Sequence, residues 1–405
     1  MSATLPPLEV RPKTSRTLSI DHLRAFLILL VVAHHAVLAY VSFAPPPDAG
    51  WSTPPMLWRA FPIVDTVRAS GLDILVVFND VVLMALLFFL AGLFTWRSLI
   101  KKGALGFLRG RTLRLGLPFA VCALALAPLA YYPAYLQRGG EPGLGSYARA
   151  WLDLPVWPSG PAWFLWVLLA FSAVAAASYR LAPAWAEKLG ERLGPLGARP
   201  GVFFALLALA SALAYVPAAS FIDPSAWTEY GPFAFQTTRI LHYALYFVLG
   251  IALGTYGISS GLLSPQGRLA RRWWLWQGWA TVFLIALIVC LVAINVQIAN
   301  GSLHPALPLV SSLVFTLSCA ASSLMLLALF VRYGHWAGSL WRSLDRSAYG
   351  IYVVHYVFVN WLQLTLLDFP GPAIVKALAV FAAAALLSWF TAILLRRIPK
   401  VAAVI

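Results

Sequence analysis

Long apolar runs separated by short polar stretches dominate the pattern along the chain. Each run is close to the roughly 20 residues that an α-helix needs to cross a hydrocarbon core of about 30 Å. Because backbone polar groups must pair internally in lipid, each run is predicted to be a membrane-spanning helix. The predicted spans are 22–42, 74–96, 115–135, 163–181, 201–218, 237–257, 275–295, 308–331, 348–367 and 372–395.

The composition excludes an ordinary soluble domain. Hydrophobic residues make up 61% of the 405-residue chain and charged residues only 11%, whereas a soluble domain carries about 25% charged residues. We therefore predict an all-α polytopic membrane protein with about ten transmembrane helices. The net charge of +15 could indicate a nucleic-acid partner. In a membrane protein such an excess is typical of cytoplasmic loops, so no nucleic acid is expected.

The positions of Lys and Arg predict the orientation. Basic residues are concentrated before the first predicted span and after every second one, as at 97–114, and the alternate connections carry few. Because basic loops remain in the cytoplasm, both termini are predicted to be cytoplasmic. The expected organisation is a disordered cytoplasmic tail at 1–19, a transmembrane domain at 20–397 and a cytoplasmic C-terminal tail at 398–405.

The first span contains two adjacent histidines, His34 and His35, inside an apolar helix. Arg24 precedes His35 by eleven residues, which in an α-helix is three turns plus about 20° and roughly 16 Å along the axis. The two side chains should therefore share a face, with His34 about 100° away and Asp21 placed to orient Arg24. Intramembrane ionisable residues are functional candidates. The alternative is that His35 only packs against a neighbouring helix.

Arg111 and Arg114 stand at the start of the third predicted span. Arginines at i and i+3 lie on one face of an α-helix and can bind phosphates through bidentate hydrogen bonds. An ordinary cluster of cytoplasmic basic residues explains their charge equally well, and charge alone favours that explanation.

Further polar residues interrupt the later spans. Tyr349, Tyr352 and His355 repeat at intervals of three in the ninth span, so they should line one helix face. Asp80 lies in the second span. Each could line a site or simply join helices by hydrogen bonds. The three cysteines, Cys122, Cys290 and Cys319, lack metal-ligand spacing, and no metal site is expected.

Several stretches together resemble the membrane acyltransferase-3 family. Arg24 and His35 match its Arg-x10-His motif, and 84–94 resembles its Phe-Phe-x-x-Ser-Gly helix, with Ala91 where Ser is common. Residues 111–119 resemble its Arg-x-x-Arg motif. The stretches 160–166, which contains Trp163, and 347–355 are similar to further family landmarks. The second and fourth spans are most similar to members that resemble the osmoregulated periplasmic glucan succinyltransferase.

This resemblance implies a multi-pass protein of the bacterial inner (plasma) membrane. Its expected activity is transfer of an acetyl or succinyl group from cytoplasmic acyl-CoA, the co-substrate, to a hydroxyl of a periplasmic or envelope glycan. His35 would be the general base or would carry the acyl group transiently. Arg24, Arg111 and Arg114 would bind the CoA phosphates. The expected partners are membrane lipids, acyl-CoA and the glycan, with a homodimer as an open option. A tightly bound cofactor is not expected.

The sequence is also compatible with a second function, that of a transporter or flippase of an anionic sugar or lipid-linked substrate. Buried charged residues and ten helices are compatible with transport. Inverted repeats and paired broken helices, which are common in transporters, are not visible in the sequence. The remaining expected site residues are His355, Tyr352, Asp80 and Trp163 as binding residues, with Asp21 and His34 as orienting residues.

Overall fold

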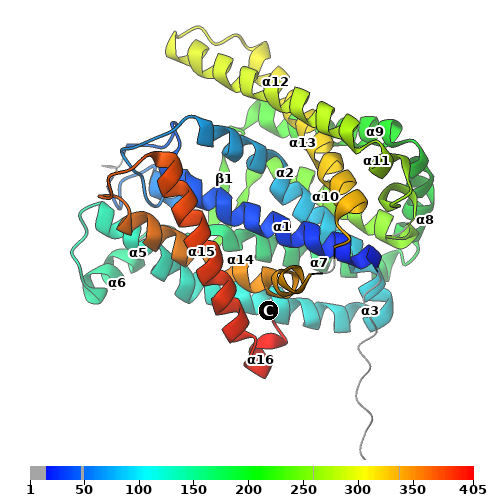
Figure 1. The fold of residues 1–405 in the computed structure, drawn as a ribbon, viewed down its shortest axis with the longest axis horizontal. Coiled ribbons are helices and arrows are strands. Elements are labelled where there is room, and N and C mark those ends of the chain that lie inside the picture. Colours follow the sequence, from blue (N-terminus) through cyan, green and yellow to red (C-terminus); the bar gives the residue numbers. More distant parts are fainter. Residues whose placement is uncertain (1–14, 47–49, 259, 337) are drawn as a thin grey trace, which may run out of the picture.

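The computed structural model is a bundle of helices in which α1 crosses the middle of the view and α12 lies at one margin (Figure 1). It describes residues 15–46, 50–258, 260–336 and 338–405. The helices are α1 Ser15–Val37, α2 Gly71–Leu93, α3 Thr95–Arg111, α4 Leu117–Val121, α5 Ala127–Gln137, α6 Leu144–Leu152, α7 Trp163–Leu181, α8 Trp185–Leu193, α9 Pro200–Phe221, α10 Ile240–Tyr256, α11 Arg268–Arg271, α12 Trp273–Ala299, α13 Ala306–Tyr333, α14 Ser339–Thr365, α15 Ala373–Leu395 and α16 Pro399–Ala402.

The predicted all-α polytopic membrane architecture is confirmed. Over the described ranges, nine helical segments are long and apolar enough to cross a membrane. The ninth predicted span, 348–367, is the one outside this set and corresponds mostly to α14, which is 27 residues long and has charged residues in its first turns. The strands that the structure describes, β1 Trp227–Tyr230 and β2 Phe233–Gln236, form a small antiparallel hairpin in which Trp227 pairs with Gln236.

Two predicted boundaries differ from the structure. Helix α1 begins at Ser15, so residues 15–19, expected in a disordered tail, are helical, and 1–14 lie outside the described residues. The basic connection at 97–114 is not a loop but mostly helix α3, which bends at Gly103, where φ is +66°. Its lysines and arginines lower the mean hydropathy of a helical segment, which is why the sequence suggests a loop there.

Helices α2 and α10 pack closely through glycines. A Cβ added at Gly92 would lie 2.2 Å from the Phe247 oxygen, and one at Gly250 would lie 2.1 Å from the Phe89 oxygen. Small residues allow the backbones of membrane helices to approach in this way. The contact fixes the position of Asp80 on α2 relative to Arg239, the residue that precedes α10.

Buried polar contacts fix α1 and α15 against the rest of the bundle. His22 on α1 contacts the Asp345 carboxylate on α14 at 2.9 Å and the Trp336 carbonyl oxygen at 2.9 Å. Each ring nitrogen of His22 therefore faces an oxygen that can accept a hydrogen bond. The Lys376 ammonium on α15 pairs with buried Asp65 at 2.8 Å.

The first and last parts of the described chain lie at the same end of the bundle. The contact of His22 with Asp345 places the start of α1 beside the first turns of α14. Arg396, which follows α15, donates hydrogen bonds to the main-chain oxygens of Arg346 and Ile405 at 2.6 and 3.1 Å. This arrangement is compatible with both termini on one side of the membrane, and the assignment of that side as cytoplasmic stays a prediction.

Candidate active site

The centre of the candidate site lies where α1 meets α14. The ring of half-buried His35 lies 5.4 Å from the ring of His355 and 4.9 Å from that of Tyr356, measured between centroids. The adjacent His34 ring is 5.2 Å away and nearly perpendicular, at 89°. The structure therefore brings together two histidines, His35 and His355, from opposite ends of the sequence.

The hydrogen bond of His355 determines its tautomer. The Nδ1 atom lies 2.7 Å from the main-chain oxygen of Tyr352, and a carbonyl oxygen can only accept, so Nδ1 carries the proton. In the neutral ring, Nε2 is then an acceptor, and this atom is buried without a partner. The Nδ1 atom of His35 is also buried without a partner. Such unsatisfied buried atoms cost free energy and are rare in folded proteins.

Gln363 holds the end of α1 in place. Its side-chain amide on α14 donates to the main-chain oxygens of His35 at 2.9 Å and Ala36 at 3.1 Å. These residues belong to the last turn of α1, where main-chain oxygens have no partner within the helix. Gln363 therefore supplies the missing partners and fixes His35 relative to α14.

A small cavity of about 20 Å³ lies behind this contact, between α14, the start of α5 and the connection at 159–162, and neither His35 nor His355 lines it. That volume is enough for about one water molecule. Tyr356, which contacts His35, and Tyr352, from the same helix, both line the cavity. Tyr352 also donates a hydrogen bond to the Pro161 oxygen. The Ser159 hydroxyl on the opposite wall is buried without a partner. The cavity thus combines a buried hydroxyl with an aromatic wall that reaches the histidines.

His34 belongs to a second polar group, on the other side of α1. It is close enough to Asp80 on α2 for the carboxylate charge to act on it. Asp80 binds the Arg239 guanidinium bidentately at 2.7 and 2.8 Å. The side chain of Asp80 is 43% exposed and that of Arg239 only 9%. His34 and His35 therefore lie near different groups of polar residues, as their helical spacing predicts.

The expected phosphate-binding arginines lie toward the end of the bundle where α1 and α14 begin. Arg24 is 46% exposed and pairs with Asp21 at 3.3 Å. Arg114 is exposed, and its main-chain oxygen accepts a hydrogen bond from Tyr349 on α14. Arg111 is half-buried, donates to the Thr95 hydroxyl at 3.2 Å and stacks over Phe107.

The prediction that Arg111 and Arg114 share a helix face assumed α-helical spacing. The structure has a π-helical turn at Thr112–Gly116, between the two residues. The wider turn changes which side chains align, and the two arginines differ in exposure. Arg111 is held by contacts within its own helical segment, which leaves Arg114 as the freer of the two.

Trp163 lies in a separate aromatic group. Its ring is 5.4 Å from that of Trp227 on β1 and 6.0 Å from that of Tyr243 on α10. Tyr243 follows Arg239 by four residues, so this group adjoins the Asp80–Arg239 pair and not the His35–His355 pair. Trp163 is therefore placed as a wall residue of the second polar group.

Sequence reasoning missed three residues of the central site. Tyr356 and Gln363 lie on the predicted ninth span, and Ser159 lies in the connection before the fourth. A polar residue within an apolar run was a usable signal for Gln363. Ser159 gave no comparable signal, because a serine in a polar connection is commonplace.

Comparison with known proteins identifies the family. A family model described as "Acyltransferase domain", of the acyltransferase-3 type, matches residues 17–393, which is most of the chain. No curated protein and no solved structure is significantly similar to the chain. The matched region includes all the site residues described above. The chain therefore belongs to the acyltransferase-3 family of multi-pass membrane acyltransferases.

Proposed function

We propose that this acyltransferase moves an acetyl or succinyl group from acyl-CoA to a hydroxyl of a periplasmic or envelope glycan, with His35 as general base. The observation that carries the proposal is the pair of buried, unpartnered ring nitrogens on His35 and His355, whose neighbour Tyr356 lines a small cavity. A buried acceptor nitrogen without a partner is poised to take a proton from a substrate.

The proposed reaction is a direct acyl transfer. The glycan oxygen attacks the thioester carbonyl carbon while His35 accepts the hydroxyl proton. A carbon–oxygen bond forms, the carbon–sulfur bond breaks, and the proton on His35 passes to the departing thiolate to give CoA. A positioned general base contributes about 10²–10⁴-fold to such a rate. Transient acylation of His35 is the alternative order of the same bond changes.

The proposed donor site extends from the arginines, which would bind the phosphates, to the histidines, where the thioester would react. Arg24 lies in the first half of α1, with His35 in its last turn, so a donor whose phosphates contact Arg24 and Arg114 could extend its thioester along α1 toward His35. Guanidinium groups suit phosphates because they donate bidentate hydrogen bonds. Arg111 would support this site indirectly, through its contact with Thr95.

The second polar group is proposed to contact the acceptor. Asp80 combines a fixed position with partial exposure, because Arg239 holds it from the buried side. A carboxylate accepts hydrogen bonds from sugar hydroxyls, and the nearby Trp163 offers an aromatic wall. His34 lies between this group and His35. The identity of the glycan, the choice of acyl group and the inner-membrane location stay predictions.

The test uses purified full-length protein and a panel of acyl-CoAs that includes acetyl-CoA and succinyl-CoA. Thiol release and acylated product are measured with and without glucan oligosaccharides. We expect glycan-dependent release and at least about a 100-fold loss in His35→Ala. The matched control is His304→Ala, since His304 is exposed and lies outside the site. Full transfer by folded His35→Ala protein would refute the mechanism. Flipping or uptake by reconstituted protein without acyl-CoA turnover would support the transporter alternative.

A further inference from the structure

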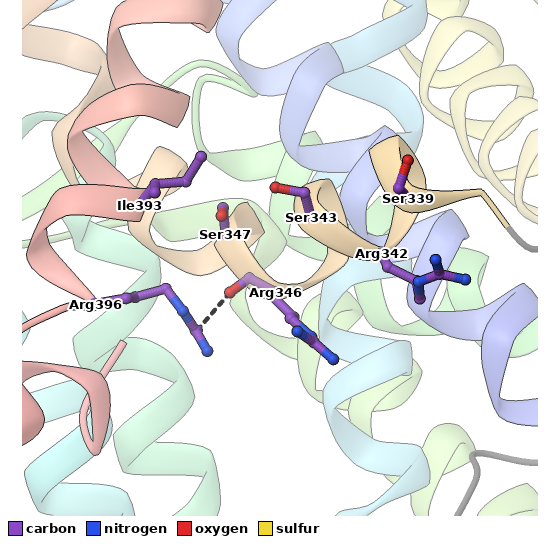
Figure 2. Close-up of a pocket in the computed structure, with 7 residues that line it drawn as sticks. All are labelled: Ser339, Arg342, Ser343, Arg346, Ser347, Ile393 and Arg396. Carbon is purple, nitrogen blue, oxygen red and sulfur yellow. Dashed lines mark hydrogen bonds between the residues drawn. The ribbon is translucent and has the colours of Figure 1, made fainter.

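A second, larger cavity lies between α14 and α15. Its volume is about 330 Å³, within the usual range of small-molecule sites. Figure 2 shows Arg342 and Arg346 projecting from α14, with Arg396 reaching toward that helix from the end of α15. The remaining lining residues are Ser339, Ser343, Ser347 and Ile393. The lining therefore combines three guanidinium groups with three hydroxyls.

The charges of this cavity are not neutralised by acidic side chains. None of its lining residues is acidic, and across the described residues no ion pair joins Arg342, Arg346 or Arg396 to an aspartate or glutamate side chain. The nearest acidic residue in the α14 sequence, Asp345, is buried against His22. Arg396 donates to main-chain oxygens of Arg346 and Ile405, whereas the guanidinium groups of Arg342 and Arg346 form no described hydrogen bond or ion pair. Like charges held together repel each other, so an anion that enters the cavity would stabilise it.

The helix itself adds to this preference for an anion. Ser339 is the first residue of α14, and the preceding Gly338 has no side chain that could cap the helix. The unpaired N–H groups and the dipole of a helix N-terminus favour negative charge. The two arginines on α14, Arg342 and Arg346, are exposed and four residues apart, so they extend from one side of the helix.

The cavity lies at the same end of the bundle as the proposed donor arginines. Tyr349, three residues after Arg346, donates to the main-chain oxygen of Arg114. On the α1 side, His22 contacts Asp345 and Asp21 pairs with Arg24. The Arg342–Arg346–Arg396 cavity is nevertheless distinct, because neither Arg24 nor Arg114 lines it.

We propose that the Arg342–Arg346–Arg396 cavity is a binding site for a phosphate group. Two sources supply that chemistry at the end of a membrane bundle: the headgroup of an anionic phospholipid, and a phosphate of a nucleotide-containing donor. Basic pockets between transmembrane helices are known to bind lipid phosphates. The inference does not require acyl transfer, because it concerns binding alone.

The test compares phosphate binding to the purified full-length protein and to the double variant Arg342→Gln/Arg346→Gln. Both side chains are exposed and form no described hydrogen bonds, so the variant should fold. Native mass spectrometry measures retention of phosphatidylglycerol against phosphatidylcholine with the same chains. Calorimetry measures affinity for CoA against 3′-dephospho-CoA. The matched control is Arg397→Gln, which removes an exposed charge next to Arg396 but outside the cavity.

We expect the double variant to bind one of these phosphate ligands at least about tenfold more weakly, since a hydrogen bond to a charged group contributes about 1.5–3 kcal/mol. Selective loss of phosphatidylglycerol assigns the site to a lipid, and selective loss of CoA assigns it to the donor. Unchanged binding of both, or an equal loss in Arg397→Gln, would overturn the proposal. If the double variant aggregates, the single variants are measured instead. Persistent acyl transfer in His35→Ala would refute the proposed mechanism, but it would not change the conclusion on phosphate binding to this cavity.

Discussion

The side-chain amide of Gln363 donates hydrogen bonds to the main-chain oxygens of both His35 and Ala36. A single residue of α14 thereby completes the last turn of α1 and holds the candidate base in register with His355. The contact makes Gln363 a positioning residue, since it reaches the backbone of His35 and not its ring.

Replacing Gln363 with Leu should leave two main-chain oxygens unsatisfied. We expect a loss of about 1–3 kcal/mol in the free energy of unfolding and a fall in kcat with little change in the KM for acyl-CoA. Gln277→Leu is the control, because Gln277 is exposed on α12. Steady-state kinetics and thermal unfolding measure both effects. An unchanged kcat would show that this contact does not position His35.

His355→Phe should separate a catalytic from a structural role of this histidine. The substitution removes the unpartnered Nε2 and also the hydrogen bond from Nδ1 to the Tyr352 oxygen, so the two effects on stability oppose each other and the unfolding temperature should change little. If Nε2 of His355 contacts substrate or a bound water, acyl transfer should fall at least about tenfold. Wild-type transfer in this variant would exclude such a role, and a large loss of stability would point to packing.

The Asp80–Arg239 pair should be costly to break from the acidic side. Asp80→Asn leaves the buried Arg239 charge without its counter-ion, which we expect to cost about 3–5 kcal/mol of stability. The Arg59–Glu229 pair provides the comparison, because its arginine is 24% exposed against 9% for Arg239, and Glu229→Gln should cost on the order of 1 kcal/mol or less. Chemical denaturation in detergent measures both variants. Equal effects would contradict the assignment of Arg239 as a buried charge.

The glycine contact between α2 and α10 should not tolerate a larger side chain. In Gly250→Ala the new Cβ would lie 2.1 Å from the Phe89 oxygen, so the helices must separate. Overpacking of this kind costs about 1–3 kcal/mol. Gly278→Ala on α12 is the control, because a Cβ there meets no atom within 4 Å. The melting temperature should fall in the first variant and not in the second.

The fold could be predicted from the sequence because hydropathy is a local signal. The run at 22–42 is apolar enough to identify α1 without knowledge of its neighbours. Helix α3 was missed because its lysines and arginines resemble a loop composition. The hairpin β1–β2 was missed because its strands are short and lie in a polar connection.

The candidate site could be predicted only in part. Helical spacing separated His34 from His35, and a histidine inside an apolar run singled out His355. The sequence could not show that His35 and His355 face each other, because that contact depends on how α1 packs against α14. It could not show the Arg342–Arg346–Arg396 cavity either, since two helices contribute to it and the arginines resemble ordinary cytoplasmic charges.

Helix α12 differs from the other candidate spans in how little of it is buried. Only 6% of its most apolar window is inside the protein, compared with 78% for α13, beside which it lies (Figure 1). Shape complementarity therefore constrains α13 strongly, whereas α12 needs mainly to remain soluble in lipid. Exchanges among Leu, Ile and Val should accumulate freely along α12 over evolutionary time. Its main contribution is then topological, since it returns the chain across the bilayer so that α13 starts from the correct side.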